Sequence, residues 1–240
     1  MHFAPLRSLL ACTAWLAVAC AAPPASAQDL PRAANGKPDL SGIWQVQNRA
    51  AAFDLEDHVA RHDAPPGWGV VDGGPIPYQP WAAEQKRANF ENRAEADPLA
   101  KCYLPGVPRV MYLDWPFQIF QTDDHLAMTF EWQQVHRLIY TSGEPQLHTG
   151  VESWMGHSRG RWEGDTLVVE VTDHNDQTWL DAAGNFHSHD LRVTERYSLL
   201  DADTLQYEAT IQDPNVFTRP WTIRLALHRH KDMPRILEYH

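Results

Sequence analysis

The segment "GRWEGDTLVVEV", which spans Gly160 to Val171, contains the clearest strand signal of the chain. From 166 to 172, Leu167, Val169 and Val171 fall on one face and alternate with residues of the other face. Such a period of two predicts a β-strand, because successive side chains of a strand point to opposite sides. Gly164-Asp165 just before it is a favourable hairpin turn. We therefore interpret the aromatic-acidic stretch at 162–165 as a turn that leads into a strand, rather than as the corner of a catalytic site.

The same period of two recurs on both sides of this segment. Further strands are expected at 41–46, from 117 to 121, from 125 to 132, and at 135–141, 191–200, 204–212 and 219–230, with a last edge strand at 235–240. Eight or nine short strands joined by Asp, Gly and Pro turns favour an antiparallel meander closed as a barrel, or a two-sheet sandwich.

Two segments interrupt the strands. Residues 50–80 contain so many prolines and glycines that regular structure is not expected, and a long loop of this kind is often a rim or lid. Residues 80–98 are rich in Ala, Glu, Gln and Arg and begin and end with proline, which predicts one surface helix.

The N-terminus has the pattern of a secretory signal. Arg7 precedes an apolar stretch of about 12 residues, and Ala25-Ser26-Ala27 fits a small-residue cleavage site. We expect a signal peptide at 1–27 that is cut after Ala27, a disordered linker at 28–37, and a single β-barrel domain at 38–240. The protein is then periplasmic or secreted, with lipid attachment at Cys20 as the alternative.

Charge and cysteine content narrow the classes of partner. The net charge is −11, which argues against nucleic acid and anionic membranes. No segment of the mature chain is apolar enough to predict a transmembrane segment. Cys102 is the only cysteine after the signal, so no internal disulfide is expected, and we interpret it as a small buried apolar residue. The oligomeric state is not predicted.

Several motifs together resemble a known family. They are "PDLSGIW" at 38–44, "PGVPR" followed by "PFQIFQT", "GRWEGDTLVVEV", and "WLDAAG" followed by "HSHDLRVTER". The set is similar to an uncharacterised family of secreted bacterial proteins, and Ser41–Trp44 resembles the opening of lipocalin barrels. The resemblance implies a mainly β fold, a lipocalin-like or calycin-like barrel with one surface helix and a long Pro/Gly-rich loop, and no particular reaction.

Acid-base residues concentrate between 148 and 189. Histidine is the commonest general acid or base, and a neighbouring carboxylate can orient it. His157, Asp181 and His187 are therefore the candidate catalytic residues, although turn formation and solubility explain such a segment equally well. His187 and His189 also form a His-x-His pair, but Glu195 lies too far along the chain for a familiar metal motif. We expect neither a metal nor a cofactor.

The ten tryptophans suggest an aromatic interior. Our first hypothesis is a barrel that binds a small apolar or aromatic molecule, and the second is a cofactor-free lyase, isomerase or hydrolase using the same cavity. A third is an envelope protein without a ligand. The strand charges face either outward in solvated pairs or inward toward a polar ligand. The candidate ligand-binding residues are Trp44, Phe117, Phe130, Glu131, Arg137, Trp154, Asn175 and Trp179.

Overall fold

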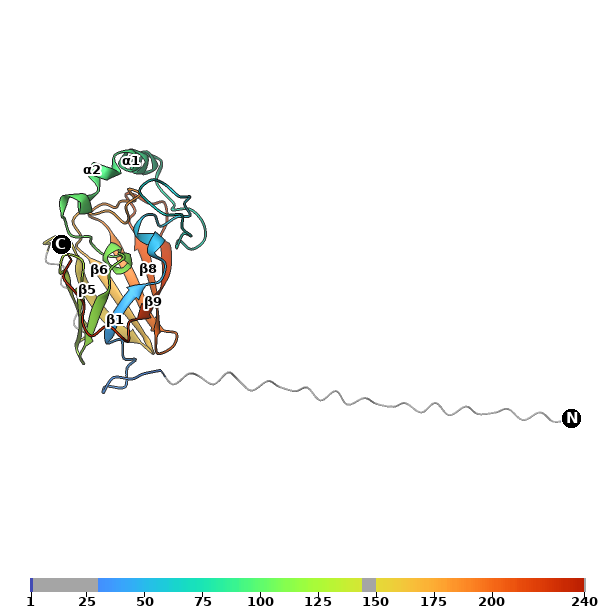
Figure 1. Ribbon diagram of the computed structural model, residues 1–240. Coiled ribbons are helices and arrows are strands. Elements are labelled where there is room, and N and C mark those ends of the chain that lie inside the picture. The colour runs from blue at the N-terminus through green and yellow to red at the C-terminus, as the bar shows by residue number, and fades with distance from the viewer. Residues whose placement is uncertain (2–29, 144–149, 240) are drawn as a thin grey trace.

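The computed structural model describes residues 1, 30–143 and 150–239, so the expected signal peptide lies outside the described residues apart from Met1. Within them, nine strands follow one another around a closed barrel, in chain order (Figure 1). The strands are β1 (Gly42–Val46), β2 (Phe117–Gln121), β3 (His125–Phe130), β4 (His136–Tyr140), β5 (His157–Glu163), β6 (Thr166–Thr172), β7 (Arg192–Leu199), β8 (Thr204–Gln212) and β9 (Trp221–Arg229). The barrel prediction is confirmed.

The strands do not form a pure antiparallel meander, as the sequence had suggested. β4 and β5 run parallel, with Ile139 opposite Ser158, whereas the other neighbours are antiparallel. Strand β5 escapes sequence detection because its first inward positions carry Ser158 and Gly160 instead of large apolar residues. Conversely, the strand expected at 235–240 is absent from the described residues, where Tyr239 makes one isolated bridge to Trp132.

The turn between β5 and β6 confirms the interpretation of the opening segment. Glu163 pairs with Thr166, so Gly164 and Asp165 form a two-residue loop. Gly164 has φ +61°, a left-handed conformation that glycine adopts without a steric cost. Glycine at the first of two loop positions suits the right-handed twist of the flanking strands.

The interior of the barrel is packed with side chains. On β7, β8 and β9 every second residue is buried, as period two requires. The inward residues of β7 are Val193, Glu195, Tyr197 and Leu199. Three of these four are apolar or aromatic, and the exception is a carboxylate.

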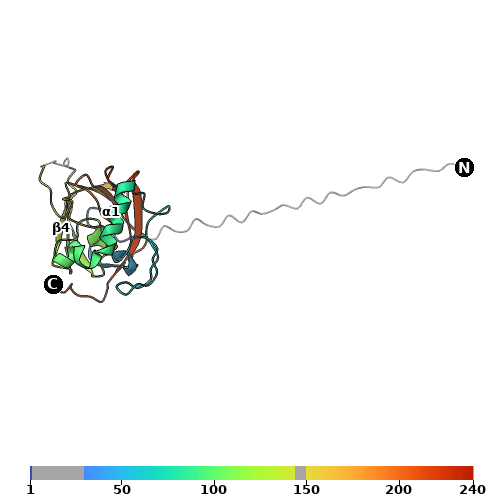
Figure 2. The same cartoon turned by 90° about the horizontal axis from the view of Figure 1, so that it is seen from above.

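Helical segments cover one end of the barrel (Figures 1 and 2). The single helix expected at 80–98 is instead two, α1 (Pro80–Glu91) and α2 (Arg93–Ala96), because Asn92 leaves helical geometry between them. Of the residues of α1 only Ala82 is buried, which agrees with a surface helix. Short 3₁₀ segments add η1 (Arg49–Ala52), η2 (Pro98–Lys101) and η3 (Arg109–Tyr112) to this end.

The remaining segments are held to the barrel wall. In the Pro/Gly-rich loop, Val71 bridges to Ile223 on β9. In the expected linker, Arg32 makes a two-bond ion pair with Asp165 at the β5–β6 turn, at 2.6 and 2.7 Å. Cys102 is exposed rather than buried, because it follows η2 on the surface. Among the described residues, no helix has both the length and the apolar character needed to cross a bilayer.

Candidate functional site

A buried polar cluster lies inside the barrel, toward its helix-covered end. Arg137 of β4 and Glu195 of β7 form a two-bond ion pair, and their side chains are 2% and 0% exposed. The Arg137 guanidinium also donates to Ser158 Oγ of β5 at 3.0 Å and to Tyr197 Oη at 3.1 Å. Tyr197 and Tyr207 donate their hydroxyls to Glu195 Oε1, at 3.0 and 2.7 Å. Four strands therefore place these groups together in an otherwise apolar interior.

Burial and mutual attraction act against each other in this cluster. Burial opposes the charge of Arg137, but Glu195 and the tyrosines outweigh it, and the pKa of Arg137 lies above its ordinary value. Burial, and then the Glu195 charge, raise the pKa values of Tyr197 and Tyr207 well above the ordinary 10. Both hydroxyls thus stay protonated, which keeps them as donors to the carboxylate.

We call the helical segments α1, α2, η1, η2 and η3, with the loops that join them to the barrel, the cap. Met111 of η3 is a cap residue that reaches this cluster. Its Sδ lies 3.9 Å from Arg137 Nη1 and 3.7 Å from Tyr197 Oη, and the residue is 1% exposed. Two anchors hold η3 in place. Arg109 makes a two-bond ion pair with Asp97, and the Tyr112 hydroxyl donates to the Leu180 carbonyl at 2.6 Å. A thioether, which is a weak acceptor, therefore covers a group of strong donors.

Two buried histidines lie in the loop between β6 and β7. His187 Nε2 is 2.6 Å from Thr178 Oγ1 and its Nδ1 is 2.8 Å from the Ser188 carbonyl. The His174 ring lies 6.0 Å from that of His187, and its Nδ1 is 3.4 Å from the Leu191 carbonyl. His174 Nε2 is buried and has no hydrogen-bond partner among the residues that the structure describes. Burial, then the neighbouring His187, lower the pKa of His174 to about 3, so the ring is neutral.

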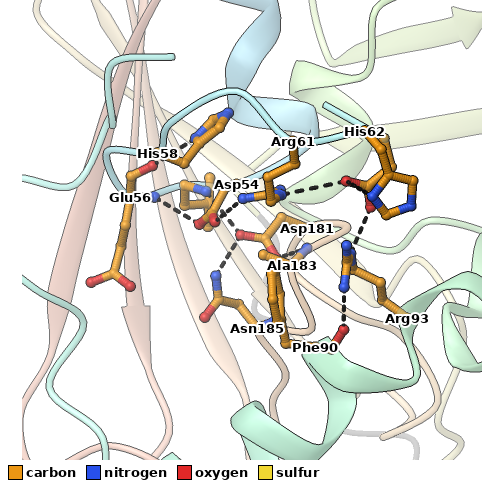
Figure 3. Close-up of polar contacts among 12 residues, drawn as sticks. Asp54, Glu56, His58, Arg61, His62, Phe90, Arg93, Asp181, Ala183 and Asn185 are labelled. Atoms are coloured by element: carbon orange, nitrogen blue, oxygen red, sulfur yellow. Dashed lines mark hydrogen bonds and ion pairs between the residues drawn. The ribbon is translucent and has the colours of Figure 1, made fainter. Parts of the chain in front are cut away.

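Asp181 is the centre of a separate network at the same end (Figure 3). Its carboxylate accepts backbone N–H groups of Leu55, Ala183 and Asn185, and the Asn185 side-chain amide as well. Burial, then the charge of Asp54, raise the pKa of Asp181 to about 6. These bonds join the loop after η1 to the loop before β7, so Asp181 holds two segments of the cap together.

Salt bridges extend the Asp181 network toward the surface (Figure 3). Asp54 pairs with Arg61 at 3.3 Å, and Asp63 pairs with Arg93 at 2.6 Å. The Arg93 hydrogen bond lowers the pKa of Asp63 to about 2. The guanidinium of Arg93 lies 4.1 Å from the centre of the Phe90 ring. These contacts tie α1 and α2 to the Pro/Gly-rich loop.

The three predicted catalytic residues have different surroundings. Asp181 and His187 are fully buried and are held by the loop contacts given above. His157 lies at the start of β5 and is partly exposed, with Nε2 3.1 Å from the Val151 carbonyl. The contacts of Asp181 are those of a structural anchor.

The predicted ligand-binding residues divide into two groups. Trp44, Phe117, Phe130 and Arg137 do point into the barrel, where they are 0–4% exposed and packed against other side chains. The Trp44 indole donates to the Leu40 carbonyl at 2.9 Å, and the rings of Phe117 and Phe130 lie 5.0 Å apart. The inward orientation considered for Arg137 is therefore observed.

The other predicted ligand-binding residues lie outside the barrel interior. Trp154 packs on Tyr103 with ring centres 4.9 Å apart, and Trp179 bridges to Phe186. Asn175 Oδ1 accepts the Gln177 N–H at 3.2 Å. Glu131, beyond the end of β3, accepts the Leu237 N–H at 2.9 Å instead of facing inward.

Sequence reasoning missed most of the buried cluster. Tyr197, Tyr207 and Met111 were not candidates, Glu195 was considered only as a metal ligand and among the strand charges, and His174 was not considered as a group with a free nitrogen. One signal was present, because Glu195 falls in phase with Val193 and Tyr197 on the apolar face of its strand. A charge on the apolar phase of a strand indicates a buried polar group. Met111 carries no such signal, since only the fold brings η3 to the cluster.

Comparison of the chain with protein-family models, curated proteins and solved structures finds no match. The resemblance to secreted bacterial proteins therefore stays a prediction, while the closed barrel is present. In the part of the chain that the structure describes, no three His, Cys, Asp or Glu side chains gather as a metal site requires.

Proposed function

We propose that this protein is a periplasmic or secreted, calycin-like binding module. It binds a small apolar or aromatic molecule that carries one hydrogen-bond acceptor. The ligand occupies the place of Met111 inside the barrel, with its acceptor at the Arg137 guanidinium and beside Tyr197. The position of the Met111 sulfur, 3.9 Å from Arg137 Nη1 and 3.7 Å from Tyr197 Oη, carries the proposal.

The chemistry of the place favours exchange of the thioether for a better acceptor. Sulfur accepts hydrogen bonds weakly, and methionine adapts to many shapes because its side chain is unbranched. A phenolic or carbonyl oxygen accepts an N–H of Arg137 more strongly, whereas the single O–H of Tyr197 is donated to Glu195. The surrounding barrel is apolar and aromatic, so the body of the ligand gains about 25 cal/mol for each Å² that it buries.

Entry requires η3 to move, because the interior is filled in this state. The segment that would move is short and runs from Gly106 to Tyr112. Gly106, at its start, has φ +73° and packs against Thr178. The free energy needed to displace Met111 lowers the apparent affinity, so a variant that lacks this side chain binds more tightly.

The test is titration with 2-naphthol, which has an aromatic body and one oxygen. Wild-type protein is expected to show tryptophan quenching and a higher melting temperature, and Met111→Ala to bind about tenfold or more tightly. Leu205→Ala is the matched control, because it removes a buried side chain at the other end of the barrel. Tyr197→Phe is expected to weaken binding.

Native mass spectrometry of protein purified without denaturation gives a second readout, namely an added mass from a retained molecule. The proposal fails if neither wild type nor Met111→Ala binds 2-naphthol and no added mass is found. It also fails if Leu205→Ala gains affinity as much as Met111→Ala, because the cluster would then have no special role.

A second candidate function is acid-base catalysis on a molecule bound in the same interior. The observation that favours it is the buried, neutral Nε2 of His174, which has no hydrogen-bond partner among the described residues. Its pKa of about 3 makes it a weak base, so it would act by accepting a hydrogen bond from the reacting group. Arg137 is close enough to His174 to contribute to the lowering of its pKa. Conversion of a bound phenyl ester or enolisable ketone, lost in His174→Gln but not in Asp181→Asn, would support this function, and equal rates in wild type and His174→Gln would refute it.

A further inference from the structure

The outer wall of the barrel divides into a charged part and an uncharged part. On the charged part, Arg161 of β5 pairs with Glu170 of β6 at 2.7 Å, and Arg224 of β9 lies 3.3 Å from Glu208 of β8. Arg196 of β7 likewise pairs with Glu163 at 3.1 Å. Such alternating ion pairs keep a sheet face solvated.

Strands β2, β3 and β4 have no Asp, Glu, Lys or Arg at any outward position. Their outward residues are Gln118, Phe120, His125, Ala127, Thr129, His136, Leu138 and Tyr140. We call this surface the β2–β4 face. Phe120, Leu138 and Tyr140 are 49%, 41% and 45% exposed. Depletion of charge together with exposed aromatic residues is the composition of an interface core.

Strand register arranges the apolar residues in one row. Phe120 is opposite Ala127, and Ala127 is opposite Leu138, so the three side chains lie side by side across the face. A hollow of about 550 Å³ is lined by these residues together with Met128, Thr129, His136 and Arg137. The row has a large residue at each end and a small one at its centre.

We infer that the β2–β4 face is the contact surface of a homodimer. Its two-fold axis lies in the interface, perpendicular to the row, and passes Ala127. Rotation by 180° about that axis exchanges the two ends of the row. Phe120 of one copy then lies against Leu138 of the other, and the small Ala127 lets the two walls approach. An isologous contact needs this kind of self-complementary surface, and an uncharged face lets two chains of net charge −11 meet.

The size of the face predicts a reversible dimer. Three strands and five residues of length cover about 14 Å by about 17 Å, an area of about 240 Å². This area is well below the roughly 800 Å² per partner of a standard interface. Residues 235–238 border the same face beside Thr129 and His136; Leu237 there is 60% exposed, and Arg235 and Glu238 place charged side chains at this edge. This border enlarges the contact but leaves it in the weak class.

The experiment is sedimentation velocity from about 5 to about 500 µM, the range in which weak interfaces associate. Wild-type protein is expected to pass from monomer to dimer, and Phe120→Glu or Leu138→Lys alone to stay monomeric. Leu200→Lys, at an exposed leucine of the β7–β8 turn, is the control that dimerises like wild type. Circular dichroism checks the fold, which exposed substitutions change little.

A mixture of the two variants tests the axis itself. The two-fold arrangement places the new glutamate of one variant against the new lysine of the other, so the 1:1 mixture is expected to form a heterodimer. A wild-type monomer at every concentration refutes the dimer, and binding of an unrelated protein or of 2-naphthol at this face would not rescue it. Dimers of either single variant as strong as wild type would also refute it, and a monomeric mixture refutes the axis through Ala127.

Discussion

The buried ion pair between Arg137 and Glu195 allows a quantitative prediction for Glu195→Gln. The carboxylate accepts two bonds from Arg137 and one from each of Tyr197 and Tyr207, and it is 0% exposed. Glutamine keeps the size of the side chain but leaves the Arg137 charge uncompensated in the interior. Removal of one partner of a buried pair costs about 3–5 kcal/mol of stability. This is a large part of the roughly 5–15 kcal/mol that folds a typical domain.

The assay is urea unfolding followed by tryptophan fluorescence. With a slope of about 2 kcal/mol per molar urea, the expected loss lowers the midpoint by about 2 M. Glu163→Gln is the matched control, because Glu163 is paired with Arg196 on the outside of the same sheet and its side chain is 43% exposed. Exposed pairs contribute about 0–1 kcal/mol, so this control is expected to unfold close to wild type.

The double variant Arg137→Met/Glu195→Gln separates charge from packing. It removes the uncompensated charge, and the amide carbonyl of the introduced glutamine still accepts the tyrosine hydroxyls. It is therefore expected to recover at least about 2 kcal/mol relative to Glu195→Gln. The reasoning is refuted if Glu195→Gln costs no more than Glu163→Gln. It is also refuted if the double variant is as unstable as the sum of the two single variants, since the charges would then not be coupled.

Three further predictions concern the cap and the β5–β6 turn. The pKa of His174 is about 3 in the fold and 6.5 ordinarily, so its stabilising effect is full above about pH 6.5 and is lost as pH falls toward 3. The free energy of unfolding of wild type relative to His174→Gln, measured by urea unfolding, should fall by about 1.4 kcal/mol per pH unit between pH 6 and 4. A difference that stays constant with pH contradicts this. Asp181→Asn should cost about 1–3 kcal/mol by thermal unfolding, because an amide nitrogen would face N–H donors, and should leave 2-naphthol binding unchanged, whereas lost binding would show a direct role. Gly164→Ala should cost about 1–2 kcal/mol because φ is +61° while the space around it is open, and Gly164→Asn should cost less; equal melting temperatures for all three residues would refute the turn argument.

The sequence alone determined the local structure of the barrel. Alternation on β7 to β9 follows directly from residue type, because burial of one sheet face requires an apolar residue at every second position. The Gly164 turn is equally local, since its conformation depends on that glycine itself. The helix from Pro80 is also predictable, because it depends on the residues of its own segment, although its break at Asn92 was not predicted.

Only the tertiary structure decided which residues meet. The parallel pairing of β4 with β5 joins chain segments that no local period links, and it brings Ser158 to Arg137. Met111 reaches the cluster from a short 3₁₀ segment whose own sequence says nothing of a partner 86 residues away. Period two also cannot tell the inside of a wall from the outside, so Arg137 and Arg161 look alike until the barrel closes and buries one of them. Desolvation depends on everything that surrounds a group in space, and closure of the barrel is the step that fixes those surroundings.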